Sequence, residues 1–129
     1  MSIETIRLSE KAKGQLITVK KNTKIDNWNV LCRWALMLSL KEESIPPHED
    51  IVTNSNVEMT WKVFGGEFSD IYLAMLRQRI KTDFGEVDED ELGYHFKLHL
   101  HRGVSYILQK SKSIDCMIKF VLEGKSSLY

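Results

Sequence analysis

The chain has 129 residues, of which 43% are hydrophobic and 28% are charged. This length and composition are typical of a single globular domain, 1–129, that needs no metal or disulfide bridge to build its core. The sequence has no signal peptide and no apolar run long enough to span a membrane, so we expect a cytoplasmic protein without a membrane partner. Cys32 and Cys116 lie far apart and outside any CxxC pattern, which favours buried free thiols over a zinc knuckle.

The formal net charge of zero conceals three segments of opposite sign. Residues 1–41 carry eight Lys or Arg against three Asp or Glu, residues 42–91 carry four against thirteen, and residues 92–129 carry six against two. Two basic segments therefore flank an acidic one. The acidic segment is better suited to docking basic partners than to binding phosphate, whereas a basic segment favours nucleic acid.

The first element predicted along the chain is a short strand over residues 3–8. Alternation along a strand would place Ile6 and Leu8 on its inner face and Ile3, Thr5 and Arg7 on its outer face. Ser9 then suits a helix N-cap. The helix that follows is basic and one-sided, with an apolar face of Ala12, Leu16 and Val19.

A polar turn at 22–26 leads to a second helix whose interior, WNVLCRWALMLSL, is apolar nearly all round. Such a pattern is typical of a buried helix. We therefore expect the core around Trp28, Leu31, Trp34, Ala35 and Leu38. A strand, a basic helix, a turn and a second helix within residues 1–41 together resemble a ribbon-helix-helix unit, in which two chains pair their strands on DNA.

The remaining chain reads as a loop followed by a largely helical part over residues 57–122. Residues 44–56 hold both prolines and predict a loop. Residues 57–63 alternate weakly as a strand, with a helix as the alternative, and Gly65-Gly66 favours a tight turn over a phosphate-binding loop. Later helices are predicted from the faces Phe68, Ile71, Tyr72, Met75, Leu76, Ile80 and Ile114, Met117, Ile118, Val121, Leu122. The expected fold class is mainly α, a single helical domain with a short N-terminal strand.

The stretch YHFKLHLHRG, residues 94–103, concentrates three histidines. A strand would place His95, His99 and His101 on one face, but a helix keeps only His95 and His99 together. The acidic residues that precede the stretch and its lack of β-branched residues at 94–101 favour the helix. No third metal ligand is evident, so we expect packing histidines, with Gly103 allowing close helix contact, and neither a metal nor a cofactor. A small metal hydrolase that uses His95 and His99 is the alternative.

Basic residues near the first helix form the candidate DNA-binding set, which is Arg7, Lys11, Lys13, Lys20, Lys21 and Lys24. Local charge ranks the lysines around the turn, Lys20, Lys21 and Lys24, first. A solvated basic face is the plain alternative. If the ribbon-helix-helix likeness extended to function, the chain would instead be a transcription regulator that reads an operator sequence through Thr5 and Arg7.

A second resemblance is carried by five blocks of sequence, which are IRLSEKAK, NWNVLCRWAL, SIPP, SNVEMTWKVFGGE and HLHRG. In this order they resemble the DndE family of bacterial DNA phosphorothioation systems. The resemblance implies a small non-catalytic subunit that works with the DndC and DndD components. It also implies a homo-oligomer, with a tetramer as one form, that binds double-stranded DNA, nicked duplex included, through surface lysines.

Overall fold

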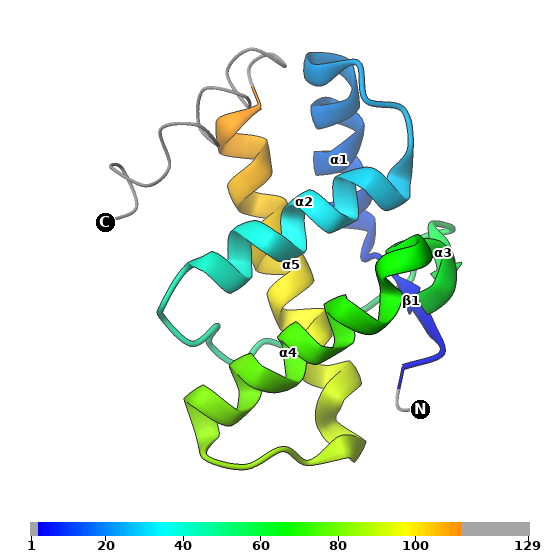
Figure 1. The fold of residues 1–129 in the computed structure, drawn as a ribbon. Helices are drawn as coiled ribbons and strands as arrows, with labels where there is room; N and C mark the ends of the chain where they lie inside the picture. Colours follow the sequence, from blue (N-terminus) through cyan, green and yellow to red (C-terminus); the bar gives the residue numbers. More distant parts are fainter. Residues whose placement is uncertain (1–2, 112–129) are drawn as a thin grey trace.

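The computed structural model describes residues 3–111, which fold mainly as α-helices around one hydrophobic core (Figure 1). This agrees with the fold class expected from the sequence. The elements in chain order are β1 (Thr5–Arg7), α1 (Glu10–Thr23), α2 (Trp28–Lys41), β2 (Glu58–Thr60), α3 (Trp61–Gly65), the 3-10 turn η1 (Gly66–Phe68), α4 (Ser69–Phe84), the 3-10 turn η2 (Glu89–Glu91) and α5 (Leu92–Lys110).

The N-terminal strand β1 pairs antiparallel with β2 of the same chain, with Ile6 opposite Met59. A ribbon-helix-helix unit would pair this strand with a second chain, so the order of elements matches that fold while the strand partner differs. Ile6 and Leu8 are buried as predicted. The outer-face prediction for Ile3 is wrong because the strand begins only at Thr5, and Ile3 is 4% exposed within the core.

Helix α1 follows the prediction closely. The Ser9 side chain accepts the Ala12 N–H and caps the helix, as expected of a serine at that position. The face that packs on the core contains Ala12, Leu16 and Val19.

Helix α2 is buried along one face and not all round. Leu31 and Ala35 are fully buried, as predicted. The predicted core positions Trp28, Trp34 and Leu38 are wrong in part, because these side chains are only partly buried and pack against the edge of the core. The sequence of α2 is apolar on nearly every side, but the helix is buried on one face only.

Helices α2 and α5 cross near the middle of the molecule (Figure 1). Gly103 of α5 lies where the backbones of the two helices meet. A Cβ atom on Gly103 would lie 1.7 Å from the carbonyl oxygen of Ala35 and 2.3 Å from its carbonyl carbon. No side chain fits between these backbones. The expected close packing at Gly103 is therefore confirmed, and α5 includes the whole 94–101 stretch as a helix.

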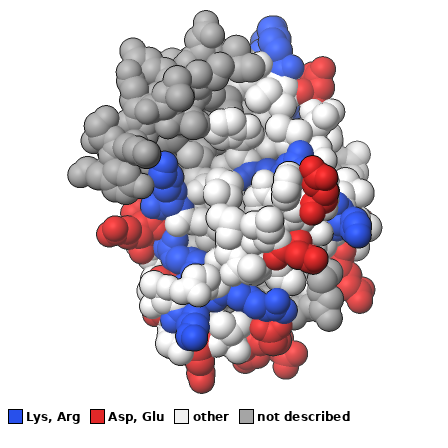
Figure 2. Space-filling view, in the orientation of Figure 1, with Lys and Arg blue, Asp and Glu red and all other residues white. Residues whose placement is uncertain are grey.

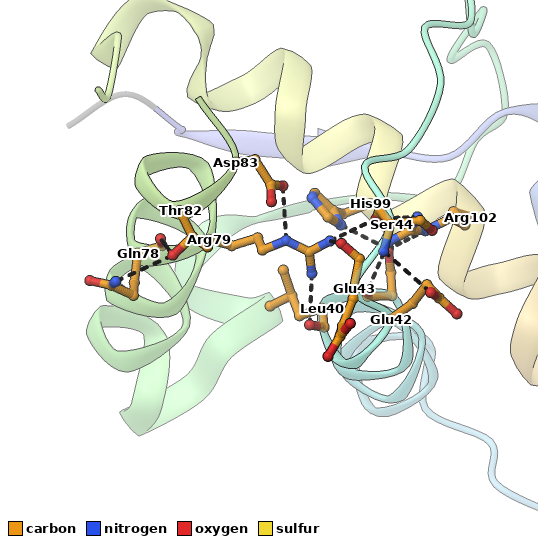
Figure 3. Close-up of polar contacts among 11 residues, drawn as sticks. Leu40, Glu42, Glu43, Ser44, Gln78, Arg79, Thr82, Asp83, His99 and Arg102 are labelled. Carbon is orange, nitrogen blue, oxygen red and sulfur yellow. Dashed lines mark hydrogen bonds and ion pairs between the residues drawn. The ribbon is translucent and has the colours of Figure 1, made fainter. Parts of the chain in front are cut away.

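Two arginines hold the C-terminal end of α2, and the first is Arg79 of α4 (Figure 3). Its Nη1 donates to the carbonyl of Leu40 at 2.8 Å, and its Nη2 donates to the carbonyl of Ser44 at 2.7 Å. Asp83, one helical turn further along α4, pairs with its Nε at 2.8 Å, and both side chains of this pair are almost fully buried. The charge of Arg79 is thereby neutralised inside the protein.

The second arginine is Arg102 of α5, next to Gly103. Its Nη2 donates to the carbonyl of Ser39 at 2.7 Å, its Nε to the Ser39 hydroxyl at 2.9 Å and its Nη1 to the carbonyl of Ser44 at 2.8 Å. The last carbonyls of a helix have no partner within the helix, and cations near them are favourable. The arginines from α4 and α5 thus fix where α2 ends, which the sequence did not reveal.

The segment between α2 and α4 contains the predicted loop, with no helix or strand from residue 42 to residue 57. Both readings of residues 57–63 hold in part, because β2 ends at Thr60 and α3 starts at once. The Thr60 hydroxyl accepts the Val63 N–H and caps the new helix, which ends the strand earlier than predicted. Gly66 has φ +60° and forms the expected turn.

Helix α4 is present as predicted, but its buried face is different. Leu73, Leu76 and Ile80 are buried, whereas Phe68 and Ile71 are 51% and 55% exposed. The prediction that Phe68 and Ile71 belong to the core face is wrong, because the helix packs with its Ser69–Leu73–Leu76–Ile80 side inward. The helix predicted around residues 114–122 lies outside the described residues.

We predict that Gly103→Ala lowers the free energy of unfolding by about 2 kcal/mol, since overpacking a tight contact typically costs about 1–3 kcal/mol. The matched control is Gly93→Ala in the same helix, where an added Cβ meets nothing within 4 Å. Gly93→Ala should leave stability unchanged or raise it by up to about 1 kcal/mol, because alanine favours helix. Urea denaturation followed by circular dichroism measures both, and equal midpoints for the two variants would contradict the close crossing.

Candidate nucleic-acid interface

The turn between α1 and α2 is fixed by its own hydrogen bonds. Lys24 adopts the left-handed conformation, φ 65°, and its N–H donates to the carbonyl of Lys20. The buried hydroxyl of Thr23 donates to the carbonyl of Val19 at 2.8 Å and accepts the Ile25 N–H at 3.2 Å. These bonds define the backbone where α1 ends and the chain turns towards α2.

Three lysines surround this turn. Lys20 and Lys21 occupy the last turn of α1, Lys24 follows it, and Lys21 and Lys24 are exposed. Lys20 is partly buried, with its ammonium 4.3 Å from the centre of the Trp28 ring, a favourable cation–π contact. Figure 2 shows basic and acidic side chains next to each other at the end of the molecule where α1 ends, as they are over the rest of this face.

The other predicted DNA-binding residues lie elsewhere. Lys11 and Lys13 belong to the first turns of α1, and ten residues of helix separate Lys11 from Lys21 by about 15 Å. Arg7 on β1 is exposed, but it forms an ion pair with Glu58 and donates to the carbonyl of Ser55 at 2.9 Å. The structure therefore brings together only the lysines of the α1–α2 turn.

The N-terminus of α2 adjoins these lysines. Its N-cap, Asn27, makes no side-chain capping bond, and the first turn of α2 has no acidic residue. Backbone N–H groups at a helix start carry partial positive charge and attract anions. The exposed carboxylate of Asp26 in the same turn offsets part of this charge. The arrangement, which we call the lysine turn (Lys20, Lys21, Lys24 and the start of α2), is suited to a phosphate of a polyanion.

Comparison with known proteins assigns the chain to a family. A family model described as the DNA sulphur modification protein DndE matches residues 5–115. The chain belongs to the DndE family. No match was found among curated proteins. A crystal structure of a DndE double mutant, with two glycines replaced by lysine and described as involved in DNA phosphorothioation, matches with a TM-score of 0.61 and 16% identity over 82% of this chain and 97% of that one. At this identity, the match shows a shared fold.

The histidines of this DndE-family chain are used for packing and hydrogen bonding. The Ser9 N–H donates to His101 Nε2 at 3.1 Å, and His101 Nδ1–H donates to the carbonyl of Lys97 at 2.8 Å. His99 Nδ1 lies 2.8 Å from the hydroxyl of the buried Ser39. Within residues 3–111, no group of three His, Cys, Asp or Glu side chains is arranged to hold a metal ion.

Burial and neighbouring cations keep His99 neutral. Burial, followed by the positive charges of Arg79 and Arg102, lowers the pKa of His99 to about 3. Burial also lowers the pKa of His101. A neutral imidazole can accept the Ser39 hydroxyl and the Ser9 N–H, whereas an imidazolium cannot accept at either nitrogen. Both histidines are therefore structural in this DndE-family fold.

Cys32 is also structural. It is fully buried in α2, and burial raises the pKa of its thiol to about 12. A thiol in that state is a poor nucleophile. Cys116 lies outside the described residues.

No helix among residues 3–111 is long and apolar enough to cross a membrane.

We predict that acid destabilises this protein through His99. A histidine whose folded pKa lies below its unfolded value binds more protons when unfolded, so stability falls as pH drops from about 6.5 towards the folded pKa. The slope for one such proton approaches about 1.4 kcal/mol per pH unit. Urea denaturation between pH 4 and pH 7 should show a shallower slope for His99→Gln.

The control is His48→Gln, because the His48 side chain is 65% exposed. It should keep the wild-type slope. Identical slopes for the wild type and His99→Gln would show that His99 is not held neutral in the folded state.

Proposed function

We propose that this DndE-family chain is a non-catalytic, cytoplasmic subunit of the DNA phosphorothioation machinery, and that it binds the backbone of double-stranded DNA through the lysine turn. The observation that carries the DNA contact is the gathering of Lys20, Lys21 and Lys24 beside the start of α2. Lysines that neutralise phosphates release counterions, which favours binding to any duplex sequence.

A backbone contact also accounts for the kind of groups in the lysine turn. Ammonium groups and backbone N–H groups position a protein on DNA without reading its bases. The contact of Lys20 with Trp28 limits the freedom of one ammonium, so less entropy is lost when a phosphate binds. Nicked duplex, which presents the same phosphates on a more flexible strand, is included among the proposed ligands.

The proposal includes assembly as well as DNA binding. We expect the chain to act as a homo-oligomer, for example a tetramer, and to work with the DndC and DndD components. One lysine turn offers only three ammonium groups. Several copies on one duplex would multiply the electrostatic contact, because linked sites bind with a high effective concentration.

An operator-reading regulator finds less support. Such a protein would present Thr5 and Arg7 on a ribbon made by two chains. Both residues are exposed, but their strand pairs with β2 and Arg7 is engaged with Glu58. A preference for one duplex sequence, tested by competition with unrelated DNA, would favour this alternative.

We predict that the triple variant Lys20→Glu, Lys21→Glu, Lys24→Glu reduces DNA affinity at least tenfold at 100 mM salt, because it replaces three attractive charges by repulsive ones. The slope of log affinity against log salt should fall by up to about 2.7, at about 0.9 for each lost phosphate contact. Fluorescence anisotropy with one labelled duplex, intact and nicked, measures both quantities.

The matched control is Lys41→Glu, Lys62→Glu, Lys81→Glu, which changes the net charge equally at exposed lysines outside the lysine turn. It should retain most of the affinity. An equal loss in both triple variants would mean that net charge, and not the lysine turn, governs binding. Circular dichroism confirms that each variant is folded.

A further inference from the structure

A cleft of about 420 Å³ opens between the proline-containing loop, the end of α4 and the start of α5. Its aromatic walls come from Phe84 on α4 and from Tyr94 and His95 on α5, and His48 lies on the loop side. The rings of Phe84 and His95 are 5.0 Å apart, and those of His48 and Tyr94 are 5.7 Å apart. We name this site the aromatic cleft. Its volume lies within the range of sites that enclose small ligands or side chains.

The rim of the aromatic cleft is apolar and accessible. Phe84 is 50% exposed and Ile45, on the opposite side, is 47% exposed. Large apolar side chains left in water around a hollow are typical of binding sites. Phe84 and Ile45 lie on opposite sides of the cleft, so neither side chain shields the other from water.

The charge around the aromatic cleft is negative. Glu91 lines it, and its carboxylate is 58% exposed although it lies 3.6 Å from His95 Nε2. Asp88 and Asp90 precede Glu91 in and beside η2, and Asp50 extends from the loop with 96% of its side chain exposed. No lysine or arginine is among the described residues that line the cleft. Arg79 and Arg102 lie near His99, which lines the cleft, but both donate to backbone carbonyls and Arg79 is paired with Asp83. The exposed rim, which carries Glu91, therefore attracts a cation.

We infer that the aromatic cleft binds an arginine side chain from a basic segment of a partner protein. Guanidinium stacks on aromatic rings and forms paired hydrogen bonds with a carboxylate, so it matches both Phe84 and Glu91. This inference rests on the proposed role as an assembly subunit and gives the chemistry of its partner. The cleft lies where α4 ends and α5 begins, away from the α1–α2 turn (Figure 1), so the cleft and the lysine turn can be occupied together.

The test uses the full-length protein and a fluorescein-labelled peptide of six arginines, with six glutamates as the negative peptide. Phe84→Ala and Glu91→Gln should each weaken binding of the arginine peptide about two- to fivefold, as expected for an exposed cation–π contact or ion pair. A peptide of six lysines should bind more weakly than six arginines, because ammonium cannot stack or form the paired bonds.

The matched controls are Phe68→Ala and Asp70→Asn at the other end of α4. Phe68 is 51% exposed, almost the same as Phe84, and Asp70 is exposed. Both controls should bind the arginine peptide as tightly as the wild type does. Equal losses at Phe68 and Phe84 would overturn the inference, because binding would then follow general surface character and not the cleft.

Two further measurements separate this inference from the proposed function. Phe84→Ala should keep wild-type DNA affinity, and the lysine-turn triple variant should keep its affinity for the arginine peptide, so either proposal can fail alone. Sedimentation velocity should give Phe84→Ala the same mass as the wild type. A smaller assembly would overturn the inference by showing that a second copy of this chain occupies the cleft.

Discussion

The close approach of α5 to the backbone of α2 at Gly103 constrains most of the molecule. With no Cβ at this point, the two helices touch backbone to backbone, and each becomes fixed relative to the other. The two ends of α2 then have defined positions. Its N-terminal end adjoins the lysine turn, and its C-terminal end leads into the loop that forms one wall of the aromatic cleft. Both surfaces proposed for binding are therefore held by the same crossing.

The polar contacts around the end of α2 complement this crossing. Burying a guanidinium is costly, and burial indeed lowers the pKa of Arg102. The cost is offset because Arg102 donates to the carbonyls of Ser39 and Ser44, and because Asp83 neutralises its neighbour Arg79. Such contacts are directional, so they specify one end point for α2 where apolar packing alone would allow a shift along the helix axis.

Local patterns predicted the elements better than their orientation. The helical period and the Ser9 cap sufficed for α1, and the helix at 94–101 followed from composition. Ile3 and Phe68 were misplaced because each stands just outside its regular element, where periodicity no longer determines the direction of a side chain. The arginine contacts with α2 were not predictable, since they join residues 39–63 positions apart. Likewise, sequence alone could rank the lysines near the turn but could not show that Arg7 is paired with Glu58.

Because the backbone of Lys24 is left-handed, stability and DNA binding favour different residues at this position. At φ 65° a side chain with a Cβ is strained by about 1 kcal/mol, and glycine would adopt the same turn without that cost. Glycine would also remove an ammonium group from the lysine turn. If this charge meets DNA as proposed, the fold gives up part of its stability to hold it there. Optimising this position for thermal stability alone would therefore select against binding.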